Sequence, residues 1–311
     1  MSDEKTRLLV VGAGVNGSVC AAGLHNAGFD VTILARGQRL EELRNTGIEI
    51  EDPIGNTRTT TMVPVIGKLE SDDLYDYIFV IVRNNQVKDL LPVLAQNRSP
   101  SIVFMVNTAL GPEGWVAALG KQRVLLGFAF AGGRREGSLI RAIRPKRAVA
   151  PFGEVDGAKT ARLKRLIEIL RTAGLRATPS TAMPDWLQTH AAMVAPLALL
   201  ILKHGCDTYA LARSREDLRT LVSALREAMQ VLRTVGRRIV PSKTLALVLL
   251  PRFAVIALFR KLLSSRIGEI GAGWHCSQAP DEMMQLAREL KELVERSKLP
   301  APTLRQLLQV L

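Results

Sequence analysis

The chain has 311 residues, of which 47% are hydrophobic, so it can bury a full core, and its length favours two domains over one. Its three cysteines, Cys20, Cys206 and Cys276, are an odd number without metal-ligand spacing, which excludes a disulfide framework and gives no metal site. The opening "MSDEKTR" has no apolar run of the kind a signal peptide needs, so we expect a cytoplasmic protein.

The net charge of +13 is distributed unevenly. Residues 1–120 hold 10 basic and 14 acidic side chains, whereas residues 121–178 hold 14 basic and 4 acidic ones. A basic segment of this kind can form an electropositive surface for nucleic acid, but here no aromatic residues are interleaved with the charges and no nucleic-acid motif accompanies them. We therefore expect a solvated helix face and hairpin, and no nucleic-acid partner.

Short apolar runs rich in β-branched residues alternate with helical patterns in the first part of the chain. They predict strands at 7–11, 30–35, 77–82, 101–106 and 124–128. Strands separated by crossover-length segments indicate a parallel sheet with helices on both faces. Two glycine-rich turns between residues 127 and 154 predict antiparallel hairpin strands, and a helix is expected at 158–173.

The strand signal disappears beyond this helix, and residues 181–311 are expected to be helical. The predicted fold is an α/β Rossmann-type domain with a parallel sheet over 1–178, followed by an all-α substrate or dimerisation domain over 179–311. The apolar runs at 191–202 and 245–259 fall short of the roughly 20 residues that span a bilayer. They favour core or subunit-contact helices, hence a homodimer and no membrane partner.

A G-x-G-x-x-G motif follows the first strand directly and opens a helical pattern. The first glycine allows a tight turn, the second lets the backbone approach a pyrophosphate, and the third allows close helix packing. The helix N-terminus would face the phosphates. The motif predicts a dinucleotide site formed by Gly12, Gly14, Val15, Asn16 and Gly17.

Arg36 ends the second strand, 24 residues after Gly12. A carboxylate in that place would hold a ribose 2′-hydroxyl, whereas a guanidinium can bind a 2′-phosphate through paired charge-assisted hydrogen bonds. The cofactor is therefore predicted to be NADP. FAD is disfavoured because flavoproteins of this type usually keep the acid. Arg39 either shares the phosphate or is a solvated charge at a helix start.

Five segments together resemble the ketopantoate reductase (2-dehydropantoate 2-reductase) family over nearly the whole chain: "VVGAGVNG", "ILARGQRLEELRNTGIEI", "IVRNNQVKDLLPVL", "MVNTALG" and "PDWLQTHAAMVAPLAL". The resemblance implies a Rossmann domain joined to a helical domain, with NADPH and a 2-keto acid meeting in the cleft between them. It also implies that Arg83, Asn84 and Gln86 lie along the phosphates and ribose of the cofactor. The family usually has lysine where this chain has Arg83.

The resemblance places Asn107 near the nicotinamide and the substrate, although an asparagine at a strand end can also cap its own turn. The family's catalytic lysine stands in a W-x-K pattern with an asparagine four residues later. Here the corresponding residues are Trp186, Gln188 and Ala192, so both polar groups are missing. Glutamine can donate a hydrogen bond to a developing alkoxide but cannot release a proton, so ketopantoate turnover is expected to be poor.

The family's catalytic glutamate corresponds to Glu282, with Asp281 as the alternative; either would also be a favourable acid in a first helical turn. His275, in what we expect to be a glycine-rich loop, could supply the missing acid or be merely exposed. His190 ranks low because residues two apart on a helix face different ways. Ser264 and Ser265 echo a serine pair that contributes to substrate binding in the family.

These observations predict an NADPH-dependent reductase acting on a small carbonyl substrate, with Gln188, Glu282, His275 and Asn107 as the catalytic candidates. The alternatives are an NADP-binding protein with little catalysis, in a sensor or accessory role, and a nucleic-acid-binding module that uses the basic segment.

Overall fold

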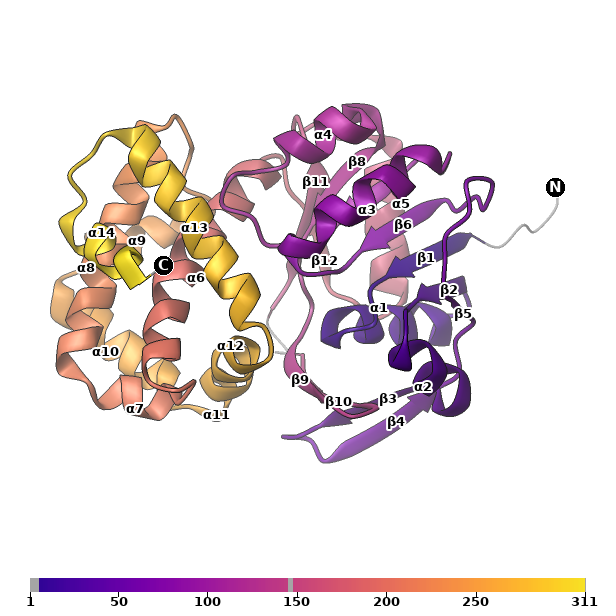
Figure 1. The fold of residues 1–311 in the computed structure, drawn as a ribbon, viewed down its shortest axis with the longest axis horizontal. Helices are drawn as coiled ribbons and strands as arrows, with labels where there is room; N and C mark the ends of the chain where they lie inside the picture. Colours follow the sequence, from indigo (N-terminus) through magenta and orange to yellow (C-terminus); the bar gives the residue numbers. More distant parts are fainter. Residues whose placement is uncertain (1–5, 145–147, 311) are drawn as a thin grey trace. The chain divides into compact units, whose positions relative to one another are not determined.

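The computed structural model describes residues 6–144 and 148–310 (Figure 1). The chain forms two compact units, the first made of residues 1–106 and 112–183 and the second of residues 107–111 and 184–311. We predicted a single boundary near Thr178. The short segment 107–111, which follows a strand of the first unit, belongs by its contacts to the second.

The first unit is built on an eight-stranded sheet with the order β12-β11-β8-β7-β6-β1-β2-β5. Six strands are parallel, while β11 runs antiparallel to β8 and pairs in parallel with β12, so the sheet is mixed and mostly parallel. All five strands predicted for this sheet are confirmed. The strands are β1 (Arg7–Val11), β2 (Asp30–Leu34), β5 (Val65–Ile66), β6 (Tyr77–Val80), β7 (Ile102–Phe104), β8 (Val124–Gly127), β11 (Ala150–Glu154) and β12 (Ala177–Pro179).

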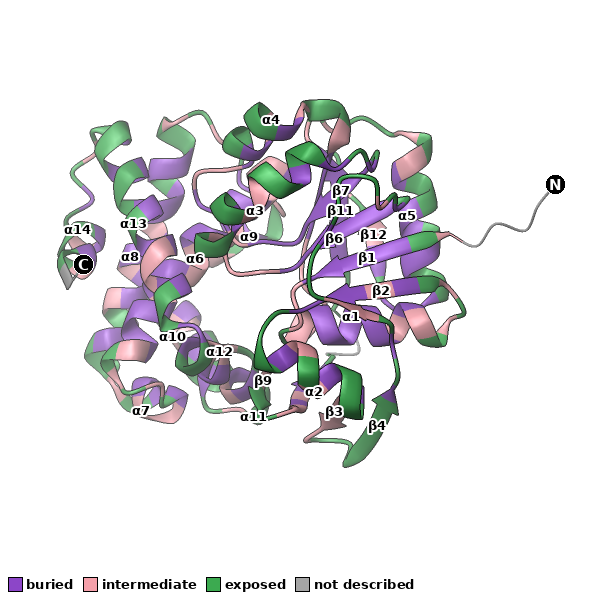
Figure 2. Cartoon of the chain, turned by 45° about the vertical axis from the view of Figure 1, so that its right-hand side comes forward, coloured by how far each residue is buried: buried purple, intermediate pink, exposed green. Residues whose placement is uncertain are grey.

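Helices cover both faces of this sheet, which explains why β6 and β7 are apolar at every position (Figure 2). Helices α1 and α5 contribute side chains to the core on one face of the sheet. Trp115 of α4 stacks on Phe104 of β7, with ring centroids 4.5 Å apart. The predicted helix at 158–173 begins at Ala161 because Thr160 caps it, accepting a hydrogen bond from the backbone N–H of Leu163. The helical elements of the unit are α1 (Val15–Asn26), α2 (Gln38–Thr46), α3 (Asn84–Gln96), α4 (Glu113–Leu119), η1 (Lys121–Arg123) and α5 (Ala161–Thr172).

A second, four-stranded sheet has the order β4-β3-β10-β9. Its hairpin β9 (Gly132–Glu136) and β10 (Leu139–Ile143) is antiparallel as predicted. We did not predict β3 (Ile48–Asp52) and β4 (Thr57–Thr61), although the alternation of isoleucine and acid over 48–51 is a strand signal. The turn between β3 and β4 is also encoded locally, because Asp52 Oδ1 accepts hydrogen bonds from the backbone N–H groups of Ile54 and Gly55, at 2.9 and 3.0 Å.

Five of the described basic residues of segment 121–178 form ion pairs with acids of this same unit. Arg141 pairs with Glu51 and Arg135 with Glu42. In both ion pairs an arginine of the basic segment contacts a glutamate from the first 120 residues. Other pairs form within the segment, between Arg162 and Glu154 and between Lys121 and Asp156. The uneven charge along the sequence is therefore partly matched in space. Lys146 and Arg147 lie outside the described residues.

The second unit, as far as the structure describes it, consists of helices and short connections, which confirms the predicted all-α region. Its α-helices are α6 (Met183–Lys203, of which Met183 belongs to the first unit), α7 (Thr208–Arg213), α8 (Arg215–Thr234), α9 (Lys243–Leu249), α10 (Arg252–Leu263), α11 (Arg266–Gly268), α12 (Trp274–Gln278), α13 (Pro280–Ser297) and α14 (Pro302–Leu307). A π-helical turn, η2 (Glu269–Gly273), precedes α12, and the 3₁₀ turn η3 (Leu308–Val310) ends the chain.

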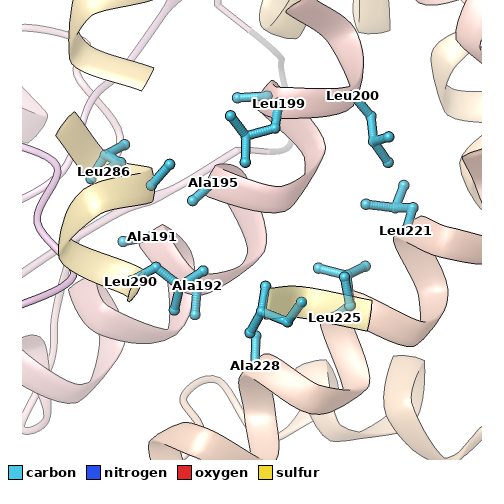
Figure 3. Close-up of a cluster of buried hydrophobic side chains, with 14 of the residues drawn as sticks. Ala191, Ala192, Ala195, Leu199, Leu200, Leu221, Leu225, Ala228, Leu286 and Leu290 are labelled. Atoms are coloured by element: carbon cyan, nitrogen blue, oxygen red, sulfur yellow. The ribbon is translucent and has the colours of Figure 1, made fainter. Parts of the chain in front are cut away.

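The core of the second unit lies where α6, α8 and α13 meet (Figure 3). Small residues of α6, among them Ala191 and Ala195, face Leu286 and Leu290 of α13, so the two helices can approach closely. By length and composition α6 is long enough to cross a membrane, and it is the one such helix among the described residues. However, 61% of its apolar window is buried inside the structure, as a core helix requires.

We predict that Leu290→Ala lowers the free energy of unfolding by about 2–5 kcal/mol, because a fully buried leucine leaves a cavity when it is truncated. Leu249→Ala is the matched control. That leucine is 81% exposed, and we expect a change within about 0.5 kcal/mol. Denaturant unfolding followed by circular dichroism measures both. Equal effects of the two substitutions would show that the core described above does not hold this unit together.

Candidate cofactor site and active-site cluster

The three glycines of the G-x-G-x-x-G motif occupy positions with different steric demands. A Cβ on Gly12, whose φ is +108°, would lie 2.3 Å from the carbonyl oxygen of Ile81, and one on Gly17 would lie 1.8 Å from that of Gly12. A Cβ on Gly14 would meet nothing within 4 Å. Gly12 and Gly17 therefore allow close packing of the turn, while Gly14 leaves open space for a ligand to approach the backbone.

Helix α1 begins directly at this turn with Gly14 as its N-cap, and no side chain caps it. The first N–H groups of a helix have no acceptor within it, and its dipole favours an anion at this end. The turn thus fits the pyrophosphate of a dinucleotide. The Asn16 side chain has another role, since its Oδ1 accepts from the N–H groups of Phe130 and Ala131 at 3.0 and 2.9 Å. Of Val15 and Asn16, therefore, only the backbone groups are available to a cofactor.

The motif lies where the sheet changes direction. Strand β1 pairs with β2 on one side and with β6 on the other, and ligands of open α/β sheets bind at the carboxyl ends of strands at such a switch point. Arg83, Asn84 and Gln86 follow β6 at the start of α3. Gln86 Oε1 accepts from the Arg83 N–H at 3.3 Å, which supports the first turn of that helix.

Arg36 and Arg39 have different environments. Arg36 is exposed just beyond the end of β2. Arg39 is only 9% exposed, and its guanidinium donates to the carbonyl oxygens of Ala13 and Ser138 and pairs with Glu42. Burial lowers its pKa. Arg39 is therefore not a solvated charge. It supports the glycine turn, and Arg36 is the exposed guanidinium of the two.

A polar cluster in the second unit contains most of the predicted catalytic residues. Asn107 Nδ2 donates to Glu282 Oε1 at 3.4 Å, and His275 Nε2 lies 3.2 Å from Glu282 Oε2. Glu282 is 5% exposed whereas Asp281 is exposed, so of the two acids Glu282 is the one that α13 turns inward. The Asn107 side chain thus contacts the acid instead of capping its own turn.

His275 was expected in a glycine-rich loop, and that prediction is wrong. It lies on α12, directly after the π-helical turn. The glycines serve close packing here: a Cβ on Gly268 would lie 2.1 Å from the Leu262 carbonyl oxygen, and one on Gly273 3.0 Å from that of Cys206. The helix holds the imidazole against Glu282 while 40% of the side chain stays exposed.

Gln188 lies on the buried side of α6, and its side chain is only 1% exposed. Its Nε2 donates to the carbonyl oxygen of Ala109 at 2.9 Å. Its Oε1 and the Oδ1 of Asn107 are buried and accept no hydrogen bond from the described residues. Ala192, four residues further along α6, is fully buried in the hydrophobic core.

Glu289 is a site residue that the sequence analysis missed. Its Oε2 accepts from the N–H groups of Ala109 and Leu110, at 2.7 and 3.3 Å, and from Thr108 Oγ1 at 3.2 Å. The carboxylate thus fixes the segment that carries Asn107. A signal was present, because Glu289 interrupts the apolar stripe of α13 between Leu286 and Leu290.

The other polar candidates have structural partners. The His190 ring stacks on Trp186 with centroids 5.2 Å apart, and burial, helped by the nearby His275, lowers its pKa to about 4. It is therefore neutral near pH 7 and unsuited to donate a proton. Ser265 caps α11 through Gly268. Among the described residues, no group of three or more His, Cys, Asp or Glu side chains is placed to hold a metal ion.

Comparisons with known proteins agree with these features. A family model described as "Ketopantoate reductase PanE/ApbA" matches residues 8–149. An uncharacterized oxidoreductase of Bacillus subtilis, YkpB, is 29% identical over 168 residues, which are 52% of this chain and 53% of that protein. A 2-dehydropantoate 2-reductase of Archaeoglobus fulgidus is 27% identical over 171 residues, 55% of each chain. The match thus spans about half the length of these curated relatives.

A likeness of fold extends further. The solved ternary structure of D-mandelate dehydrogenase with NADH and anilino(oxo)acetate aligns with a TM-score of 0.80 at 14% identity, covering 98% of this chain and 96% of that one. A mostly parallel sheet with a glycine-rich turn, followed by a helical unit with a buried acid, is the two-domain Rossmann-type fold that this solved structure shares. The ketopantoate reductase family model thus matches the first half of the chain, which agrees with the resemblance seen in the motifs there. The motif resemblance places Gln188 where that family has its lysine.

The depressed pKa of His190 predicts a pH-dependent stability. The pKa is about 4 in the folded chain and 6.5 ordinarily, so the unfolded state binds the proton first as pH falls. Stability should therefore decrease from about pH 6.5 to about pH 4, by at most about 3 kcal/mol. The loss should be smaller than that limit because the residue keeps some exposed surface.

Chemical denaturation of the wild type and of His190→Phe across this range measures the effect. We expect the difference in unfolding free energy between the two proteins to change with pH in this window and to be constant above it. A constant difference throughout would contradict the assignment of a neutral, buried imidazole.

Proposed function

We propose that this protein is an NADPH-dependent reductase of ketopantoate-reductase type, which transfers a hydride to the carbonyl of a 2-keto acid or a related small substrate. The observation that carries the proposal is the inward-facing Glu282, which contacts both Asn107 and His275. The glycine turn, the uncapped N-terminus of α1 and the exposed Arg36 support a dinucleotide with a 2′-phosphate. The reduced nicotinamide, when bound, supplies the hydride.

The residues of the cluster have separate tasks in this proposal. Glu282 orients Asn107 and His275 through hydrogen bonds to its two carboxylate oxygens. Gln188 contacts the substrate region but cannot release a proton, so His275, which keeps exposed surface, is the candidate donor. Ketopantoate turnover is expected to be poor for the same reason. We further propose that the protein works in the cytoplasm, where NADPH is available.

Arg36 gives the first test. NADPH should bind about tenfold or more tightly than NADH, because a charge-assisted hydrogen bond contributes about 1.5–3 kcal/mol. Arg36→Ala should bring the two affinities close together, and Arg44→Ala, which removes an exposed arginine paired with Glu41, should not. Fluorescence titration of both cofactors measures this. An unchanged preference in Arg36→Ala would refute the 2′-phosphate role.

Glu282 gives the second test. Glu282→Gln should lower turnover about 10²-fold or more, since a neutral amide replaces the carboxylate that orients both Asn107 and His275. Glu292→Gln, on the exposed side of the same helix, should leave turnover unchanged. NADPH consumption and product formation against a panel of small keto acids and related substrates measure both, with cofactor affinity checked in each variant. Tight NADPH binding without turnover of any substrate would favour a binding protein over a reductase.

A further inference from the structure

Two buried amide oxygens in the second unit lack a donor. They are Oε1 of Gln188, whose side chain is 1% exposed, and Oδ1 of Asn107; neither accepts a hydrogen bond within residues 6–144 and 148–310. Buried polar atoms are nearly always hydrogen-bonded, and each exception calls for an explanation. Both oxygens occur on residues placed at the catalytic position of the family, which points to a ligand that brings donors.

The orientation of both amides is fixed by what their nitrogens contact. Gln188 Nε2 donates to the Ala109 carbonyl oxygen, and Asn107 Nδ2 donates to the Glu282 carboxylate. Turning either amide over would place two oxygens against each other, so the assignment of oxygen and nitrogen follows from the network. Gln188 therefore presents an acceptor where the family's lysine presents a donor.

The acceptors belong to one neighbourhood. The Gln188 side chain donates a hydrogen bond to Ala109. Ala109 follows Asn107 by two residues, so the backbones of Asn107 and Ala109 lie within about 7 Å of each other. The carboxylate of Glu282 adjoins Asn107 and is shared with His275. His190, the other histidine of this region, is neutral near pH 7. The buried atoms of Gln188 and Asn107 that lack a partner in the described part of the chain are thus hydrogen-bond acceptors.

We propose that the site takes a protonated imine, formed from a 2-keto acid and an amine, in preference to the ketone itself; this inference rests on the proposed reductase function. Reduction of a ketone creates a negative oxygen, which amide oxygens and a carboxylate repel. An iminium group is positive and carries an N–H that Gln188 Oε1 or Asn107 Oδ1 can accept. The absence of the lysine then suits the substrate.

The chemical balance needs no proton donor at the reacting atom. A hydride from the reduced nicotinamide forms the new C–H bond, and the π electron pair of C=N becomes the lone pair on nitrogen. The substrate is reduced to a secondary amine and the nicotinamide is oxidised, and the amine then takes a proton from solvent. The imine itself forms from the keto acid and the amine with release of water.

The test uses the full-length protein with NADPH and two kinds of substrate. Pyruvate is offered with and without excess methylamine, and the cyclic imine 1-pyrroline-2-carboxylate is offered alone. We expect kcat/KM for the imines to exceed that for pyruvate and ketopantoate by on the order of a hundredfold. Mass spectrometry of the products distinguishes N-methylalanine and proline from lactate and pantoate.

Gln188→Lys replaces the acceptor by a donor and should shift the preference toward ketones by on the order of a hundredfold. Gln306→Lys makes the same chemical change at an exposed position of α14 and should leave the preference unchanged. Binding gives a second readout that does not depend on turnover. With NADP bound, calorimetry should show N-methylalanine binding more tightly than lactate, and Gln188→Lys should reverse that order.

Equal or faster reduction of the ketones by the wild type would overturn the imine assignment while leaving the reductase function in place. Tighter binding of lactate than of N-methylalanine would do the same. If NADPH binds and neither ketones nor imines are reduced, the proposed reductase function fails instead. Should Gln188→Lys prove unfolded by circular dichroism, the comparison of wild-type substrates and ligands decides alone.

Discussion

The buried carboxylate of Glu289 fixes the part of the second unit from which the polar cluster is built. A buried charge is costly unless hydrogen bonds compensate it, and here the Thr108 hydroxyl and the N–H groups of Ala109 and Leu110 all donate to one oxygen. Those contacts set the direction of the Ala109 carbonyl. That carbonyl in turn receives Gln188 and decides which atom of its amide is left over.

The orientation of the Gln188 amide therefore depends on Glu289, which lies seven α-helices further along the chain, on α13. Asn107 is held in the same way by Glu282, which also contacts His275. The hydrogen bonds that such a site can offer a ligand depend on which polar atoms already have a partner within the protein. In this chain the committed atoms are donors, so acceptors remain for a ligand. This arrangement of acceptors is the physical basis of the proposed preference for a substrate that carries an N–H donor.

The first unit shows a comparable dependence around its glycine turn. Gly12 and Gly17 let strand, turn and helix approach more closely than a side chain would permit, and Arg39 supports the turn through the Ala13 carbonyl. Because Arg39 is committed to the fold, the neighbouring Arg36 is left exposed. Two arginines three residues apart thus differ completely in environment.

The sequence by itself determined the sheet, the glycine turn and the helical second unit, because each depends on local periodicity and on backbone demands that only certain residues meet. Its resemblance to the ketopantoate reductase family also pointed to Glu282, with Asp281 as the alternative. The sequence did not reveal the strands β3 and β4 or the role of Glu289. These depend on contacts with segments far away in the sequence, since β3 pairs with β10 and Glu289 accepts hydrogen bonds from Ala109 and Leu110. It misplaced His275, since glycines that pack helices closely look in sequence like glycines of a loop. Tertiary structure alone decided which amide atoms of Asn107 and Gln188 are used up, because hydrogen-bond partners far apart in the chain, such as Ala109 and Glu282, meet them only after folding.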